Sequence, residues 1–176
     1  LPNTPRHHQY FSMWLRPVPP ENAHFAIRNA MYELKKLVEN GLTEDQFQAT
    51  KKYLINYSKL WVQTSSRRLG YQMDSEFYGT AFFIDKLEKE LNVLRLADVN
   101  SVIKKYLSAT NIKVAVVCND AKSLQDAMFN NAPSPIKYAS PVSQKILDED
   151  KVIEVFPLEI NKDKSKIVSS KELFEK

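Results

Sequence analysis

The chain has 176 residues, of which 43% are hydrophobic and 11% aromatic, and its formal net charge is +4. This length can bury a core without metals or disulfides, and this apolar content excludes wholesale disorder. The single cysteine, Cys118, excludes an internal disulfide, and the basic residues are not concentrated in one patch, which argues against a dedicated polyanion site.

The first element expected along the chain is a short strand. Residues 1–9 are a polar, proline-broken lead-in, and the adjacent His7 and His8 supply too few ligands for a metal, so we interpret them as surface residues. The aromatic-rich run Tyr10–Leu15 predicts a strand that ends at Pro17, because proline cannot donate to a sheet ladder. Since the chain starts without methionine and enters this strand almost at once, we expect it to be the later part of a longer precursor.

Two long amphipathic helices are expected next. The first begins at Glu21 and ends at Gly41, a residue that adopts the left-handed conformation readily. Thr43 begins the second helix, with Gln46 as its capping-box partner. Their inward residues recur at a spacing of three and four: Ala23, Ala26, Ile27, Ala30, Met31, Leu34, Leu37 and Val38, then Phe47, Thr50, Leu54, Tyr57 and Trp61.

The rest of the chain predicts more helices and a second strand. Ser65–Arg68 is expected to be a break or a new helix cap, after which a helical stretch runs to Gly79. Further helices are expected over 81–91 and 97–107, and Asp120 is expected to cap a short helix. The apolar run Ile112–Cys118 predicts a strand covered on both faces, with Cys118 as a buried small residue rather than a nucleophile. Three prolines make residues 131–141 a connector, and Lys166–Val168 is a short β-like piece.

These elements predict an α+β fold in which a mixed or antiparallel sheet is covered by four to five long helices. The two strands Tyr10–Leu15 and Ile112–Cys118 are expected to belong to one sheet. The predicted core consists of Phe11, Ile27, Ala30, Met31, Leu34, Leu54, Phe83, Leu87, Val102, Ile103, Val114 and Val116.

No residue is predicted to be catalytic, to bind a cofactor or to ligate a metal. His24 has no second histidine four residues away, so we interpret it as a surface histidine. The aromatic residues Tyr71, Phe77 and Tyr78 could serve as a base-stacking set for a nucleic acid beside Arg67 and Arg68. We favour the interpretation that the arginines are a solvated charge pair and that the aromatic residues pack between helices.

A series of short stretches, in this order, resembles the second part of the non-catalytic C-terminal domain of pitrilysin/insulinase-like zinc metallopeptidases. The series covers roughly two thirds of the chain: Phe11–Pro17, Pro20–Ala23, Glu33–Leu34, Asn40–Phe47, Lys51–Leu54, Leu69–Gly79, Leu96–Asn100, Ile103–Leu107 and Val114–Val117. The resemblance implies that residues 1–131 are the later part of that inactive domain, and that residues 132–176 are a C-terminal extension packing back on it. It also implies the partial metallopeptidase fold of the family.

The resemblance implies a role without catalysis for this segment. The family's metal motif, His-x-x-Glu-His, does not occur among the three histidines, so zinc is implied only in the catalytic half of the parent protein. The family's substrate-contacting arginine and tyrosine lie upstream of the stretch at Phe11, so their role is not carried over to Arg67, Arg68 or Tyr71. The implied function is to build the substrate chamber and to support the catalytic half.

The same resemblance sets the expected partners and compartment. The partners are the remainder of the same polypeptide or a homologous catalytic domain, and a peptide substrate, with no nucleic acid and no membrane span. A second copy of the chain, bound through an exposed sheet edge, is an alternative partner. By analogy the parent is an exported bacterial enzyme, periplasmic or secreted.

Two other functions remain open from the sequence. The first is a structural or assembly scaffold of the same fold without peptidase activity, because some relatives lose the metal site. The second, more remote, is a nucleic-acid-binding α+β module that uses the arginine pair and the tyrosines.

Overall fold

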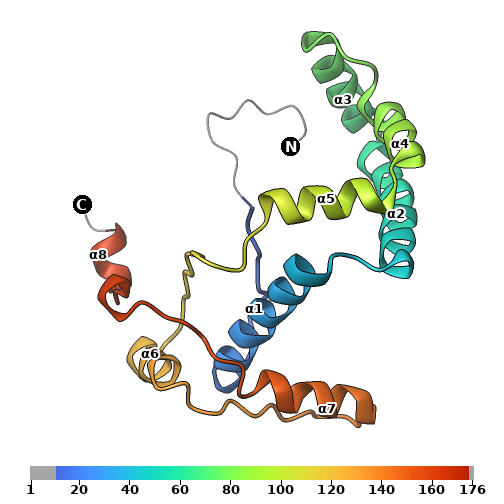
Figure 1. The fold of residues 1–176 in the computed structure, drawn as a ribbon. Coiled ribbons are helices and arrows are strands. Elements are labelled where there is room, and N and C mark those ends of the chain that lie inside the picture. Colours follow the sequence, from blue (N-terminus) through green and yellow to red (C-terminus); the bar gives the residue numbers. More distant parts are fainter. Residues whose placement is uncertain (1–10, 175–176) are drawn as a thin grey trace. The chain divides into compact units, whose positions relative to one another are not determined.

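The computed structural model describes residues 11–174, and the regular elements of this part of the chain are all helical (Figure 1). The α-helices are α1 (Ala23–Asn40), α2 (Glu44–Ser58), α3 (Ser65–Phe77), α4 (Phe83–Val93), α5 (Leu96–Tyr106), α6 (Ala121–Phe129), α7 (Gln144–Ile153) and α8 (Ser170–Phe174). Short 3-10 turns occur at Pro20–Asn22 (η1), Lys59–Val62 (η2) and Lys162–Lys164 (η3). No described helix combines the length and the apolar character that a bilayer crossing needs.

The predicted α+β fold is wrong, because residues 11–174 contain no strand and therefore no sheet. Phe11–Leu15 and Ile112–Cys118 form neither helix nor strand, while Tyr10 lies outside the described residues. No backbone hydrogen bond joins these two runs within the described chain. A strand exists only by pairing with another strand, so an apolar run alone predicts burial but not a ladder.

The described chain forms two compact units, and the division falls within α1. The first unit holds Phe11 and Leu37–Leu107, and the second holds Ser12–Lys36 and residues 108–174. The expected boundary between residues 131 and 132 stays a prediction.

Aromatic rings and side-chain caps hold the first unit together. Phe83, at the start of α4, stacks on Trp61 of η2 at 6.2 Å and on Tyr71 of α3 at 5.9 Å between ring centroids. Buried Ser75 of α3 accepts a hydrogen bond from the backbone N–H of Phe83, which ties the two helices at that point. Lys51 of α2 donates to carbonyls at the end of α4, where the helix dipole favours a cation.

The turn between α1 and α2 is locked by a residue of α5. Gly41 has φ +70°, as expected for a helix end. The Asn100 side chain accepts from the Leu42 N–H at 2.8 Å and donates to the Leu42 carbonyl at 3.1 Å. A Cβ on Gly41 would lie 2.7 Å from the Asn100 side chain, so only glycine fits both the backbone angle and the contact.

The second unit is built on the first part of α1. Buried Phe25, Ile27 and Leu34 of α1 belong to the same unit as buried Ile153 and Leu158. Tyr32 of α1 packs edge-to-face on Phe156. Lys36 donates to Glu149 of α7 at 2.8 Å and to Glu33 at 3.0 Å, and these hydrogen bonds raise the pKa of Lys36 above its usual range.

The local helix predictions are confirmed. Thr43 and Gln46 form the predicted capping box, and Asp120 caps α6 through the Ser123 N–H. Helices α4 and α5 lie within two residues of the predicted ranges, whereas α3 already begins at Ser65, where a break or a new cap was predicted, and ends two residues before Gly79.

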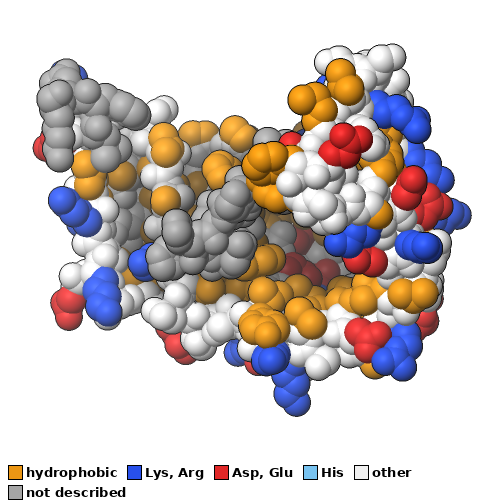
Figure 2. All heavy atoms as spheres, turned by 90° about the horizontal axis from the view of Figure 1, so that it is seen from above, with side chains coloured by type: hydrophobic (Ala, Val, Ile, Leu, Met, Phe, Trp, Pro, Cys, Tyr) orange, Lys and Arg blue, Asp and Glu red, His pale blue; other side chains and the backbone are white. Residues whose placement is uncertain are grey.

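The predicted core is confirmed only in part. Ile27, Leu34 and Ile103 are buried, while five of the predicted residues are partly exposed: Ala30, Met31, Leu54, Phe83 and Leu87. Four are exposed, namely Phe11, Val102, Val114 and Val116, and three of these belong to the runs that were expected to be strands. Figure 2 shows apolar side chains, in orange, open to solvent on the face that it draws.

Candidate functional site

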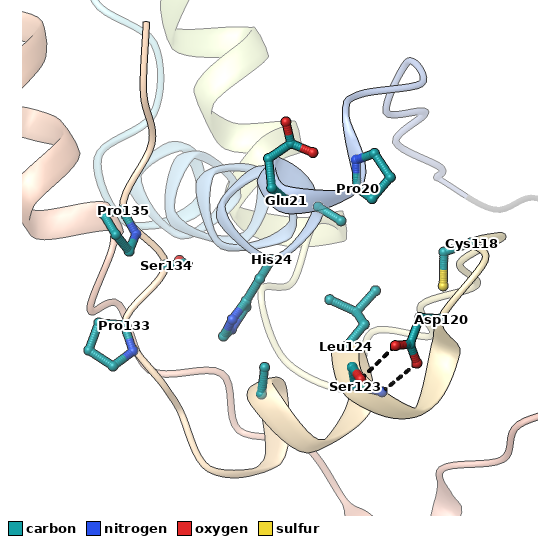
Figure 3. Close-up of a pocket in the computed structure, with 12 residues that line it drawn as sticks. Pro20, Glu21, His24, Cys118, Asp120, Ser123, Leu124, Pro133, Ser134 and Pro135 are labelled. Atoms are coloured by element: carbon teal, nitrogen blue, oxygen red, sulfur yellow. Dashed lines mark hydrogen bonds between the residues drawn. The ribbon is translucent and has the colours of Figure 1, made fainter.

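A pocket of about 320 Å³ lies within the second unit (Figure 3). Its lining comes from the start of α1, from α6 and the residues before it, and from the connector at Pro133–Pro135. The lining residues are Pro20, Glu21, Ala23, His24, Cys118, Asp120, Ser123, Leu124, Ala127, Pro133, Ser134 and Pro135. Apolar side chains provide much of the wall, and His24 reaches into the space between the connector and α6.

His24 is buried, so its interpretation as a surface histidine is wrong. Its Nε2 atom has no hydrogen-bond partner among the described residues. Burial first, and then the positive charge of Arg28 one turn further along α1, lower the pKa of His24 to about 4. The imidazole is therefore neutral near pH 7 and cannot contribute a positive charge to the pocket.

Arg28 lies behind the pocket wall and is fully buried, with 0% of its surface exposed. Its Nη1 atom donates to the Ala132 carbonyl at 2.8 Å, to the Ser134 hydroxyl at 2.9 Å, and to the Glu154 carbonyl. Glu154 caps the C-terminal end of α7, where the helix dipole favours a cation. Arg28 thus ties α1 to the connector and to α7 without a carboxylate partner in the described chain.

The pocket's other polar groups are Asp120, Ser123 and Cys118. Both Asp120 carboxylate oxygens accept from Ser123, from its N–H and its hydroxyl, and these bonds lower the pKa of Asp120. Cys118 is partly exposed rather than buried as predicted. Among the described residues, no hydrogen bond links His24 with Cys118 or Asp120, and the Nε2 atom of His24 has no partner.

The other described residues that the sequence analysis considered do not lie at this pocket. Tyr71 packs on Phe83, as predicted for a tyrosine between helices. Arg67 is exposed, and exposed Arg68 lies over the Phe82 ring at 5.6 Å. These three residues belong to the first unit, whereas His24 belongs to the second, and His7 and His8 lie outside the described residues.

Sequence reasoning missed the Arg28 cluster. An arginine four residues after a histidine on an amphipathic helix is expected on the polar face. One feature of the sequence could have indicated that Arg28 is buried. A large apolar residue, Phe25, lies one turn before Arg28 and outside the predicted apolar stripe, so that side of α1 also carries a residue that tends to be buried. Residues 11–174 contain no group of three His, Cys, Asp or Glu side chains that could hold a metal ion.

The low pKa of His24 predicts a loss of stability in mild acid. The folded-state pKa is about 4 and the unfolded value about 6.5, so the unfolded state takes up the proton first. The contribution of neutral His24 to the free energy of unfolding is therefore complete above about pH 6.5. As the pH falls towards 4, the free energy of unfolding should drop by about 1–3 kcal/mol. Urea unfolding at several pH values should show this decline in the natural chain and a smaller one in His24→Gln. Equal declines in both would contradict the burial of His24.

Comparison with known proteins identifies no relative of this chain. No protein-family model matches the chain, and searches of curated proteins and of solved structures give no significant match.

Proposed function

We propose that the chain is a non-catalytic part of a pitrilysin/insulinase-like zinc metallopeptidase, which supports the catalytic half and helps to enclose its peptide substrate. The partner in this proposal is the remainder of the parent polypeptide or a homologous catalytic domain, and the zinc belongs to that partner. The proposal rests first on the ordered series of sequence stretches that resemble this family.

One contact in the first unit carries the proposal further. Two of the resembling stretches, Asn40–Phe47 and Leu96–Asn100, are far apart in sequence. Asn100 nevertheless makes both of its amide hydrogen bonds to Leu42 and fills the space beside Gly41. A glycine turn alone is common between helices, but a glycine turn fixed by an asparagine from a later helix is a much more specific arrangement. The contact means that the residues of these two stretches depend on each other in the folded chain, which supports treating the stretches as parts of one pattern.

The exposure of apolar residues in the second unit supports a role within a larger assembly. Trp14, Leu15, Val114 and Val117 are all exposed, and they belong to two runs outside the helices. Exposed apolar runs of this kind indicate a surface that another polypeptide covers. A supporting domain needs such a contact surface for its partner, whereas an enzyme that acts alone does not need one.

A peptidase assay tests the proposal. An unstructured peptide is incubated with the chain alone, with a His-x-x-Glu-His catalytic domain of this family encoded by the same genome, and with both together. We expect no zinc-dependent turnover by the chain alone, binding of the chain to the catalytic domain, and a higher kcat/KM for the pair.

Each other result has a defined meaning. Chelator-sensitive turnover by the chain alone, surviving removal of contaminating protease, would overturn the non-catalytic role. Binding without any change in turnover would favour the scaffold function, and absence of binding would overturn both. Steeply salt-dependent binding of nucleic acid would favour the remote alternative instead.

A further inference from the structure

The pocket of the second unit is lined by one buried polar side chain that lacks a partner, and this side chain is His24. The residue is 6% exposed, and its ring reaches into the space between α6 and the connector (Figure 3). Its Nε2 atom forms no hydrogen bond within residues 11–174. Burying a polar atom without a partner is unfavourable, so a bound group that forms a hydrogen bond with Nε2 gains affinity from this atom.

The neighbouring polar side chains of the pocket already have partners. Both carboxylate oxygens of Asp120 accept from Ser123. The Ser134 hydroxyl accepts from Arg28 and donates to the Glu154 carbonyl at 3.4 Å. No other buried side-chain nitrogen or oxygen of the lining lacks a partner within the described chain. The imidazole is therefore the polar contact that the pocket offers to a bound molecule.

The charges around the pocket disfavour ions of either sign. Glu21 and Asp120 are exposed carboxylates of the lining, and they repel an anion. Burial, and then the positive charge of Arg28 behind the wall, lower the pKa of His24, so the imidazole is neutral near pH 7. The same positive charge repels a cation placed beside the ring. The pocket therefore favours an uncharged molecule.

The pocket has room for a single ring with small substituents. Its volume of about 320 Å³ is near the lower end of the range for ligand pockets, and a cavity of about 150 Å³ already holds benzene. Apolar contacts are available from Pro20, Leu124, Ala127 and Pro133. A compact apolar body fits both the size and the wall.

We propose that this pocket binds a small uncharged molecule with an apolar body and a hydroxyl group, which forms a hydrogen bond with Nε2 of His24. A hydroxyl both donates and accepts, so it suits this nitrogen in either tautomer of the neutral imidazole. The apolar body lies against Leu124, Ala127 and the prolines of the wall. This site goes beyond the proposed function and does not depend on it.

Two fluorinated probes test the hydrogen bond on the whole natural chain. para-Fluorophenol and fluorobenzene differ by one hydroxyl, and fluorine NMR at pH 7 measures the affinity of each. We expect para-fluorophenol to bind about ten-fold more tightly, because its hydroxyl becomes the partner of a buried unpaired atom. Equal affinities, or no binding of para-fluorophenol, would overturn the proposal.

His24→Leu removes the nitrogen and keeps an apolar side chain of similar size. In this variant the preference for para-fluorophenol should disappear, while fluorobenzene should bind at least as tightly as before. The four affinities form a cycle that separates the hydrogen bond from other effects of the substitution. A preference that persists in a variant shown to be folded by circular dichroism would overturn the role of His24. The comparison on the natural chain stands even if the variant does not fold.

Two alanines of α6 test where the probe binds. Ala127 lines the pocket, whereas Ala121 belongs to the same helix but not to the lining. Ala127→Leu fills part of the space and should weaken the binding of para-fluorophenol about ten-fold, while Ala121→Leu should leave it unchanged. Equal effects of the two substitutions would place the probe elsewhere and overturn the proposal.

Charged probes test the selection for an uncharged molecule. para-Fluorobenzoate and para-fluorobenzylamine keep the ring and replace the hydroxyl by an anionic and a cationic group. Each should bind more weakly than para-fluorophenol by about ten-fold. Tighter binding of either ion would overturn the proposed ligand class. These assays contain no catalytic domain, so their failure leaves the peptidase proposal standing, and failure of the peptidase assay leaves this proposal standing.

Discussion

Arg28→Ala is expected to lower the free energy of unfolding by about 3–5 kcal/mol. The change leaves the Ala132 carbonyl and the Ser134 hydroxyl without their donor, at about 1–3 kcal/mol for each buried acceptor. It also empties the space of a long side chain with 0% exposure. Removing the buried charge, together with the Nε and Nη2 atoms that have no hydrogen-bond partner among the described residues, opposes these costs but does not cancel them, because the C-terminal end of α7 compensates part of the charge.

Urea unfolding followed by circular dichroism measures this change. Ser134→Ala is the matched variant, since it removes one acceptor and leaves Arg28 bonded to two carbonyls. It should cost about 1 kcal/mol. Arg28→Lys should lie between the two, because lysine retains the charge but is too short to place its nitrogen where Nη1 makes all three hydrogen bonds. A loss below about half a kcal/mol for Arg28→Ala would show that the cluster contributes little to stability.

Most helices before α7 could be predicted from sequence because their boundaries depend on local chemistry, whereas α7 and α8 were not predicted. Gly41, Thr43 with Gln46, and Asp120 each act within one turn of the chain, and all were predicted correctly. The strands could not be predicted in this way, because a ladder needs a partner strand. The run Ile112–Cys118 has the composition of a strand but no ladder partner in the described chain.

The candidate site was hidden from sequence for a related reason. His24 is buried because α6 and the connector at Pro133–Pro135 close over the start of α1, a contact between segments more than ninety residues apart. The partners of Arg28 Nη1 are two backbone carbonyls and a hydroxyl, while Nε and Nη2 have no hydrogen-bond partner among the described residues, and backbone acceptors leave no pattern in a sequence. If Arg28 were paired with a carboxylate, the sequence would offer Asp and Glu residues as candidate partners. Backbone carbonyls occur at every residue, so the sequence does not indicate which of them Arg28 contacts.

Leu34→Ala is expected to cost about 2–5 kcal/mol, the range for truncating a well-buried leucine. Leu34 is 3% exposed on α1, so the change removes buried apolar atoms and leaves a cavity that its neighbours refill only in part. The matched control is Asn29→Ala, an exposed position of the same helix. It should stay within about half a kcal/mol of the natural chain or gain slightly from the helix propensity of alanine.

Val114→Ala completes this experiment, because the sequence placed Leu34 and Val114 in the same core. The structure separates them, since Val114 is 58% exposed. Its truncation should therefore cost less than about half a kcal/mol in the isolated chain. Urea unfolding of both variants measures the contrast. A loss for Val114→Ala equal to that for Leu34→Ala would mean that the run Ile112–Cys118 is buried in solution. A loss that appears only when a catalytic domain is bound would instead identify this run as part of the surface that the partner covers.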